Sequence, residues 1–143
     1  MAEYVYAEEQ TVAPGQNVLL IDSISCSRRR VLHRNGSGIL TLRGVTDCPC
    51  AAFARYKVEF NGNIAVPAGE TPGEISLALA ISGEPLQTSK ARVTPTVTEA
   101  YFNVTSVAHV TVPVGCCTSI AVENTSLINT LVANANLVIS EDI

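Results

Sequence analysis

The most reactive side chains in this sequence are its five cysteines, Cys26, Cys48, Cys50, Cys116 and Cys117. One proline separates Cys48 from Cys50, while Cys116 and Cys117 are adjacent. Structural zinc sites usually use Cys-x2-Cys knuckles, whose spacing lets two sulfurs reach one ion. Neither pair has that spacing, so the sequence predicts no metal site and no other cofactor.

An odd number of cysteines leaves at least one thiol either free or paired between chains. Neighbouring residues of a strand point to opposite faces, so we expect one of Cys116 and Cys117 to face the core and the other to face outward. Two interpretations of the five cysteines stay open. They form disulfides between protomers of an assembly that meets oxidising surroundings, or they pack as reduced, half-buried apolar side chains.

Catalysis by a cysteine or serine nucleophile would need a base beside it. The two histidines, His33 and His109, lie within apolar strand patterns, and the chain contains no nucleophile elbow and no cysteine-enzyme signature. Two histidines without an adjacent glutamate also do not make the metal set of a cupin-like enzyme. We therefore predict that the protein is not an enzyme and has no catalytic residues.

Basic residues gather in one part of the chain, because seven of the nine lie between positions 28 and 57. The densest group is Arg28, Arg29, Arg30 and Arg34, which we interpret as a candidate docking patch for an acidic partner. A guanidinium can hold a carboxylate or phosphate through two hydrogen bonds. The alternative is a solvated loop that balances the acidic N-terminal segment. The net charge of −4 argues against a nucleic-acid partner.

The sequence predicts that the elements that position these side chains are short β-strands. Apolar runs recur between turn signals such as Pro14–Gly15, Asn35–Gly36 and Asn61–Gly62, and no segment of about ten residues keeps a helical apolar stripe. Expected strands lie at residues 17–21, 31–33, 39–42, 56–60, 64–66 and 75–81, followed by three after residue 100. We predict one all-β jelly-roll sandwich of roughly eight to ten antiparallel strands without a significant helix. It would span residues 9–143, after an N-terminal arm at residues 1–8.

Composition suggests self-association, since 47% of the residues are apolar and only 15% are charged. A chain with so few charges often hides part of its aliphatic surface against partner chains. The N-terminus lacks the basic start and apolar run of a secretory signal, and no apolar stretch approaches the roughly 18 residues of a membrane span. We therefore expect synthesis in the cytoplasm without a signal peptide and no membrane partner.

The order of several segments resembles a known superfamily. These segments are VAPGQNVLLID, GSGILTLRG, IAVPAGETPGEISLALAISGEPL, YFNVTSVAHVTVPVGCCTSIAVENTS and VANANLVI. They are similar to the trimeric jelly rolls of the tumour necrosis factor and complement-head superfamily over about residues 10–143. The bacterial and phage versions look most similar: the tip domains of collagen-like spore-surface proteins, and short proteins of gut Firmicutes and their phages. A Gly-X-Y stalk is missing from this chain.

The resemblance implies a homotrimer without enzymatic activity. Aromatic residues on an inner strand of such trimers often pack around the threefold axis, which makes Tyr101 and Phe102 candidate threefold-interface residues, with ordinary core packing as the alternative. The expected function is a structural display protein on a phage virion, either a capsid decoration or a head or tail fibre component. Neighbouring structural proteins would then be its partners.

Two other functions stay open. One is a spore-surface or appendage (filament) subunit that is crosslinked through cysteines at the spore or cell exterior. The other is a glycan- or receptor-binding module, for which surface glycans would be the partner.

Overall fold

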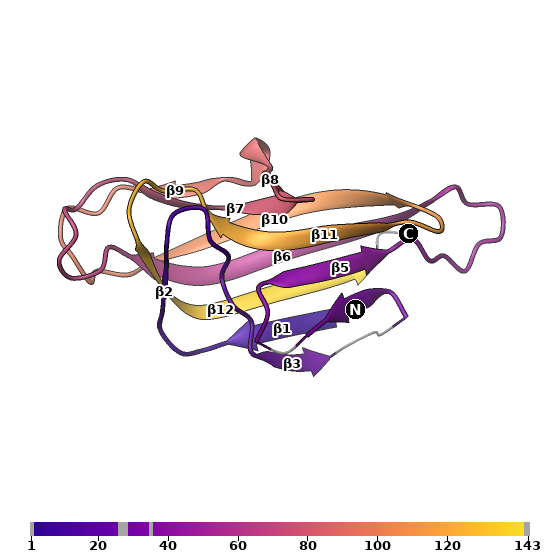
Figure 1. Ribbon diagram of the computed structural model, residues 1–143, viewed down its shortest axis with the longest axis horizontal. Coiled ribbons are helices and arrows are strands. Elements are labelled where there is room, and N and C mark those ends of the chain that lie inside the picture. Colours follow the sequence, from indigo (N-terminus) through magenta and orange to yellow (C-terminus); the bar gives the residue numbers. More distant parts are fainter. Residues whose placement is uncertain (1, 26–28, 35, 142–143) are drawn as a thin grey trace.

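The computed structural model describes residues 2–25, 29–34 and 36–141, which form a sandwich of two six-stranded sheets (Figure 1). One sheet contains β1 (Ala2–Tyr6), β2 (Gln10–Val12), β3 (Asp22–Ser25), β6 (Phe53–Ala65), β10 (Phe102–Pro113) and β12 (Thr130–Glu141). The other contains β4 (Val31–His33), β5 (Ile39–Arg43), β7 (Ile75–Ile81), β8 (Glu84–Pro85), β9 (Ala91–Val93) and β11 (Cys117–Asn124). We call them the β6 sheet and the β7 sheet.

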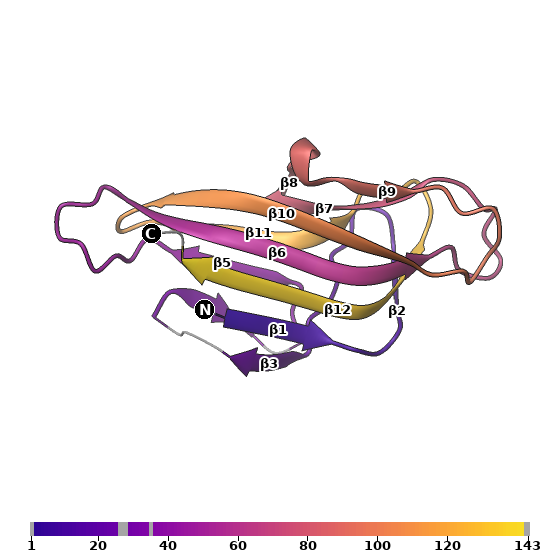
Figure 2. The same cartoon turned by 180° about the vertical axis from the view of Figure 1, so that it is seen from behind.

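All strand pairings are antiparallel. The β6 sheet has the order β10-β6-β12-β1-β3, which Figure 2 shows from its own side, and β2 pairs with β12. The β7 sheet has the order β4-β5-β11-β7-β8, and β9 pairs with β7. The predicted all-β antiparallel sandwich is confirmed.

The described residues contain twelve strands, more than predicted, because short edge pieces such as β8 and β9 pair with longer strands. Their one helical element is a 3-10 turn at Gln87–Ser89. Among the described residues no helix is long and apolar enough to cross a membrane.

Alternation of apolar and polar residues builds the core. In β6 the side chains of Tyr56, Val58 and Phe60 are fully buried, while Lys57 and Glu59 between them lie on the outer face. Burial of one such large apolar side chain stabilises the fold by roughly 1.5–3 kcal/mol. The inward residues of both sheets meet in one continuous cluster between the layers.

The predicted hairpin turn at Asn61–Gly62 is wrong, because β6 runs through these residues without a break. Gly62 pairs with Val104 of β10, and Asn61 pairs with both Thr105 and Asn136. A Cβ on Gly62 would lie 2.9 Å from the ring of Phe60. The glycine therefore makes room for an aromatic ring in the core and does not reverse the chain.

The predicted N-terminal arm at residues 1–8 is also corrected, since Ala2–Tyr6 form β1. This strand lies between β12 and β3, and Ala2 and Tyr4 are buried. The segment Ala-Glu-Tyr-Val alternates small or aromatic residues with outward-facing ones, which is the period of a strand. The first strand is thus part of the sandwich.

A buried amide, Asn124, holds the end of β11 to its surroundings. Its Nδ2 donates to the carbonyl oxygens of Val12 (2.8 Å) and Ile128 (3.1 Å). Its Oδ1 accepts from the Ser126 amide (2.9 Å) and the Thr130 hydroxyl (3.4 Å). Because every polar atom of this side chain is hydrogen-bonded, its burial does not cost stability.

We expect Asn124→Ala to lower the free energy of unfolding by about 2–3 kcal/mol, because it leaves buried carbonyl and amide groups without partners. Urea unfolding followed by circular dichroism measures this change. Asn17→Ala is the matched control, since that half-buried amide has no side-chain hydrogen bond to the described residues. The control should change stability by less than about 0.5 kcal/mol. Equal losses in both variants would contradict the role of Asn124.

Candidate functional site at the cysteine-bearing end

Two segments that are distant in sequence meet at one end of the sandwich, and we call residues 44–52 and 113–117 the cysteine end. The Gly44 amide donates to the carbonyl oxygen of Cys116 (2.8 Å), and the Gly115 amide donates to that of Gly44 (3.0 Å). A Cβ at Gly44 would lie 1.9 Å from the Pro113 carbonyl oxygen, so only glycine allows this approach. The loop and the turn are thus joined through their backbones.

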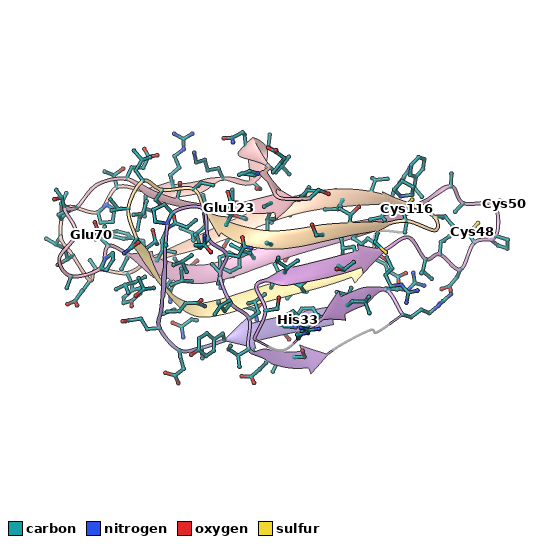
Figure 3. All side chains as sticks on the ribbon, viewed as in Figure 1. His33, Cys48, Cys50, Glu70, Cys116 and Glu123 are labelled. Atoms are coloured by element: carbon teal, nitrogen blue, oxygen red, sulfur yellow. The ribbon has the colours of Figure 1, made fainter. Side chains whose placement is uncertain are left out.

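Four of the five predicted cysteines lie at this end. Cys48 and Cys50 lie on the projecting loop, and Cys116 lies on the turn (Figure 3). Cys117 begins β11 opposite Arg43. All four are exposed free thiols. Cys26 lies outside the described residues.

The expectation that one of the adjacent thiols faces the core is wrong. Cys116 still belongs to the turn, and β11 begins only at Cys117. Ile120 and Val122 point inward, so strand alternation places Cys117 on the outer face. The interpretation as half-buried apolar side chains therefore fails for the four described cysteines.

The described histidines lie away from the cysteine end. The His33 Nε2 is 3.0 Å from the carbonyl oxygen of Ser37, and its ring packs 4.7 Å from that of Tyr4 (Figure 3). His109 lies in β10 four residues before Pro113, which is about 13 Å along an extended strand. The four described thiols therefore have no imidazole base next to them. No group of three or more His, Cys, Asp or Glu residues within the described ranges could hold a metal ion.

An ionic network beside the thiols engages Arg30, which is only 9% exposed. Its Nη1 donates to the carbonyl oxygen of Val45 (2.7 Å), its Nη2 donates to Asp47 Oδ2 (2.9 Å), and its Nε donates to the carboxylate of Glu141. Arg29 reaches the other oxygen of Asp47 at 2.8 Å. The hydrogen bond from Arg29 and the charges of Arg30 and Arg29 lower the pKa of Asp47. The network ties the end of β12 to the loop.

The predicted docking patch is wrong for Arg30, which belongs to this network. Arg30 is buried and its guanidinium is bound within the chain, so it is not available to an outside anion. Arg29 and Arg34 are exposed, and Arg29 pairs with Asp47. Arg28 lies outside the described residues. Sequence reasoning missed Asp47 and Glu141 as partners because neither is a neighbour of Arg30 along the chain.

A pocket of about 460 Å³ opens beside the network. It is lined by Arg30, Thr46, residues 51–56 and Glu141. Arg30 and Glu141 in its wall pair with each other, the exposed Arg55 adds a second guanidinium, and no thiol is among its lining residues. The thiols are therefore exposed outside this pocket, where they can take part in thiol–disulfide exchange.

Tyr101 and Phe102 lie at the opposite end of β10 from the cysteine end. They are 39% and 43% exposed, so the alternative of ordinary core packing is wrong for both. The Tyr101 hydroxyl donates to the carboxylate of Glu9. Desolvation and this hydrogen bond to an anion raise the pKa of Tyr101 to about 12. Their role at a threefold interface stays a prediction.

Comparison with solved structures identifies the fold. The chain is similar to the globular domain of zebrafish complement 1qA, with a TM-score of 0.64 at 16% identity over 96% of this chain and 94% of that chain. The fold is a jelly roll of the complement 1q and tumour necrosis factor type, as the sequence resemblance predicted.

Two carbohydrate-binding structures are less similar. The C-terminal domain of the sugar-binding protein EclA has a TM-score of 0.42 at 14% identity, over 94% of this chain and 79% of that chain. The CBM22-1 xylan-binding domain of Paenibacillus barcinonensis Xyn10C has a TM-score of 0.39 at 10% identity, over 99% and 94%. No protein-family model and no curated protein matches the sequence.

We expect Arg30→Met to lower the free energy of unfolding by about 2–4 kcal/mol, because it leaves the Glu141 carboxylate and the Val45 carbonyl without their partner. Urea unfolding at neutral pH measures the loss. Arg29→Met is the matched control, since Arg29 contacts the same aspartate from an exposed position. Its expected change is within about 0.5 kcal/mol. A loss as large in the control would contradict the special role of the buried arginine.

We expect Tyr101 to ionise at a pH of about 12. The raised pKa means that its stabilising effect is complete below the ordinary value of 10.0 and is lost as the pH rises through the folded-state value. The difference in phenolate absorbance between the native protein and Tyr101→Phe, titrated while the fold is followed by circular dichroism, measures this pKa. Glu9→Gln should move the midpoint toward 10.0. A midpoint near 10.0 in the unmodified chain would refute the contact.

Proposed function

We propose that this chain is a non-enzymatic structural subunit that assembles into a homotrimer and is displayed on the surface of a larger assembly. The observation that carries the proposal is the edge strand β10. It is twelve residues long and pairs on one side only, with β6. Not one Asp, Glu, Lys or Arg occurs in Phe102–Pro113.

Natural sheets usually protect their edges with short strands, charged residues or bulges, because an exposed edge can pair with another chain. The other edge strands among the described residues are short, which limits their pairing with another chain. β2, β4 and β9 have three residues each, β3 has four and β8 has two. β10 is long and uncharged, which favours a partner that covers it.

The surface along β10 also exposes three large apolar or aromatic side chains. Val107 on the outer face is 44% exposed, and Phe102 and Tyr101 at the start of the strand are similarly exposed. Asn103 and Thr105 lie between them, and their side chains already bond to Asn63 and Asn61 of β6. Exposed aromatic and aliphatic side chains beside satisfied amides are typical of a protein interface.

A second copy of the chain is the occupant that we propose for this surface. If the β10 edge contacts a different surface of the next copy, the contact is heterologous, and it forms a closed ring when the rotation between copies closes. The resemblance to trimeric jelly rolls supports three copies. The non-enzymatic role is supported by the separation of the described thiols from both histidines.

The surface of a phage virion is the location that we propose for the trimer, as a capsid decoration or fibre component. Its support is the sequence resemblance to phage and bacterial jelly rolls. A spore or appendage surface is the alternative from the same resemblance. Immunogold labelling of purified virions and of spores from the same host distinguishes the two, and labelling of neither would refute both.

We expect a light-scattering mass of three times 15.1 kDa for the reduced protein. Val107→Lys places a charge on the outer face of β10 and should reduce the mass to one copy without loss of strand signal in circular dichroism. Ile39→Lys is the matched control, because Ile39 is a similarly exposed aliphatic residue on β5 of the other sheet. The control should stay trimeric. A monomeric native chain would refute the proposed assembly, and a trimeric Val107→Lys would refute the β10 interface.

A further inference from the structure

The cysteine end carries exposed chemistry that the proposed trimer contact does not use. We propose that Cys116 and Cys117 link this chain to a second copy in a neighbouring assembly through disulfide bonds, end to end. The inference rests on the proposed structural function, which it extends from one trimer to a pair of trimers.

The linking thiols are accessible and held in place. Cys116 and Cys117 are both exposed, and the turn that carries them is bonded to Gly44 through two backbone hydrogen bonds. The Val114 amide also donates to the carbonyl oxygen of Ala52 (3.0 Å). These backbone hydrogen bonds fix the conformation of the turn, so both thiols are held at exposed positions where a second chain can reach them.

The adjacent thiols are poorly placed to react with each other. Consecutive Cα atoms lie about 3.8 Å apart across a trans peptide, whereas disulfides usually need roughly 4.4–6.8 Å between Cα atoms. None of the described peptide bonds is cis. A bond between Cys116 and Cys117 would thus distort the turn, which leaves both thiols for another partner. Cys48 and Cys50 are separated by Pro49 and are not subject to this limit.

The position of the thiols points to a copy in another assembly. The β10 edge runs along the side of the sandwich, while the thiols lie at its end (Figure 3). Association along β10 therefore leaves the cysteine end free. Half-exposed Phe53 and Val114 at this end add apolar surface, and the carboxylate of Asp47 is neutralised by Arg29. Arg43 and Arg55 also lie at this end, so contact between two ends would rest on the disulfide bonds and these apolar side chains.

Glutathione disulfide is a sufficient oxidant for the link. A thiolate of one copy attacks it, which forms a mixed disulfide and releases one glutathione. A thiolate of the second copy attacks the protein sulfur of that mixed disulfide and releases the second glutathione. One protein S–S bond forms, two thiol protons are lost from the protein, and both electrons reduce the oxidant to two glutathione molecules.

The test compares the native mass of the protein by light scattering before and after oxidation with glutathione disulfide. All chains carry Cys26→Ser, and the unmodified chain is run in parallel. We expect the mass to double on oxidation, covalent dimers of twice 15.1 kDa on a non-reducing gel, and reversal by dithiothreitol. The reduced mass reports the proposed trimer separately, because the doubling is measured relative to it.

Paired variants identify the thiols. Cys116→Ser with Cys117→Ser should abolish the doubling, while Cys48→Ser with Cys50→Ser removes the same number of exposed thiols and should retain it. Unchanged thermal unfolding of both variants shows that the fold is intact. The proposal is wrong if the mass stays at its reduced value, which would mean glutathione adducts, links within one chain or links within one trimer. It is also wrong if the doubling survives without Cys116 and Cys117.

Discussion

The uninterrupted pairing of β6 with β10 on one side and β12 on the other is the constraint on which the arrangement of this molecule depends. Phe53 pairs with Pro113 and Ile64 with Phe102, so the two strands run in register over the length of the sandwich. This register puts the β10–β11 turn beside the loop that precedes β6, and it puts Tyr101 and Phe102 at the other end. Both candidate surfaces follow from it.

Two buried polar side chains, Asn124 and Arg30, form hydrogen bonds that hold the ends of strands in place. Asn124 bonds to the β2 strand and to its own following loop, and Arg30 bonds to Asp47 and Glu141. A buried amide or guanidinium is tolerated only when its hydrogen-bonding groups are paired, because desolvation otherwise costs several kcal/mol. Such residues stabilise the sandwich but are not available to partners. The two surfaces on which the proposals rest are instead the uncharged edge of β10 and the exposed thiols.

The β10 edge and the exposed thiols would form different kinds of contact, one non-covalent and the other covalent. An uncharged strand edge with exposed Val107 and Phe102 favours non-covalent packing, which depends on desolvation of apolar groups and backbone amides. The thiols of Cys116 and Cys117 form covalent bonds that depend on the oxidant present. An assembly built on both would have trimers that form under reducing conditions and links that form only under oxidising conditions.

The sequence by itself determined the fold class and several turns, because these features depend on neighbouring residues. Alternation along β6 and β10 identified strands, and the turn at Pro14–Gly15 is present, with Gly15 at a φ of 76° and the Gln16 amide bonded to the Ala13 carbonyl oxygen. Only the tertiary structure decided that Asn61–Gly62 lies in mid-strand, because Gly62 is required there by the ring of Phe60. It also decided that Arg30 is buried and that the loop and turn cysteines share one end, because these outcomes depend on the register and pairing of residues far apart in the chain.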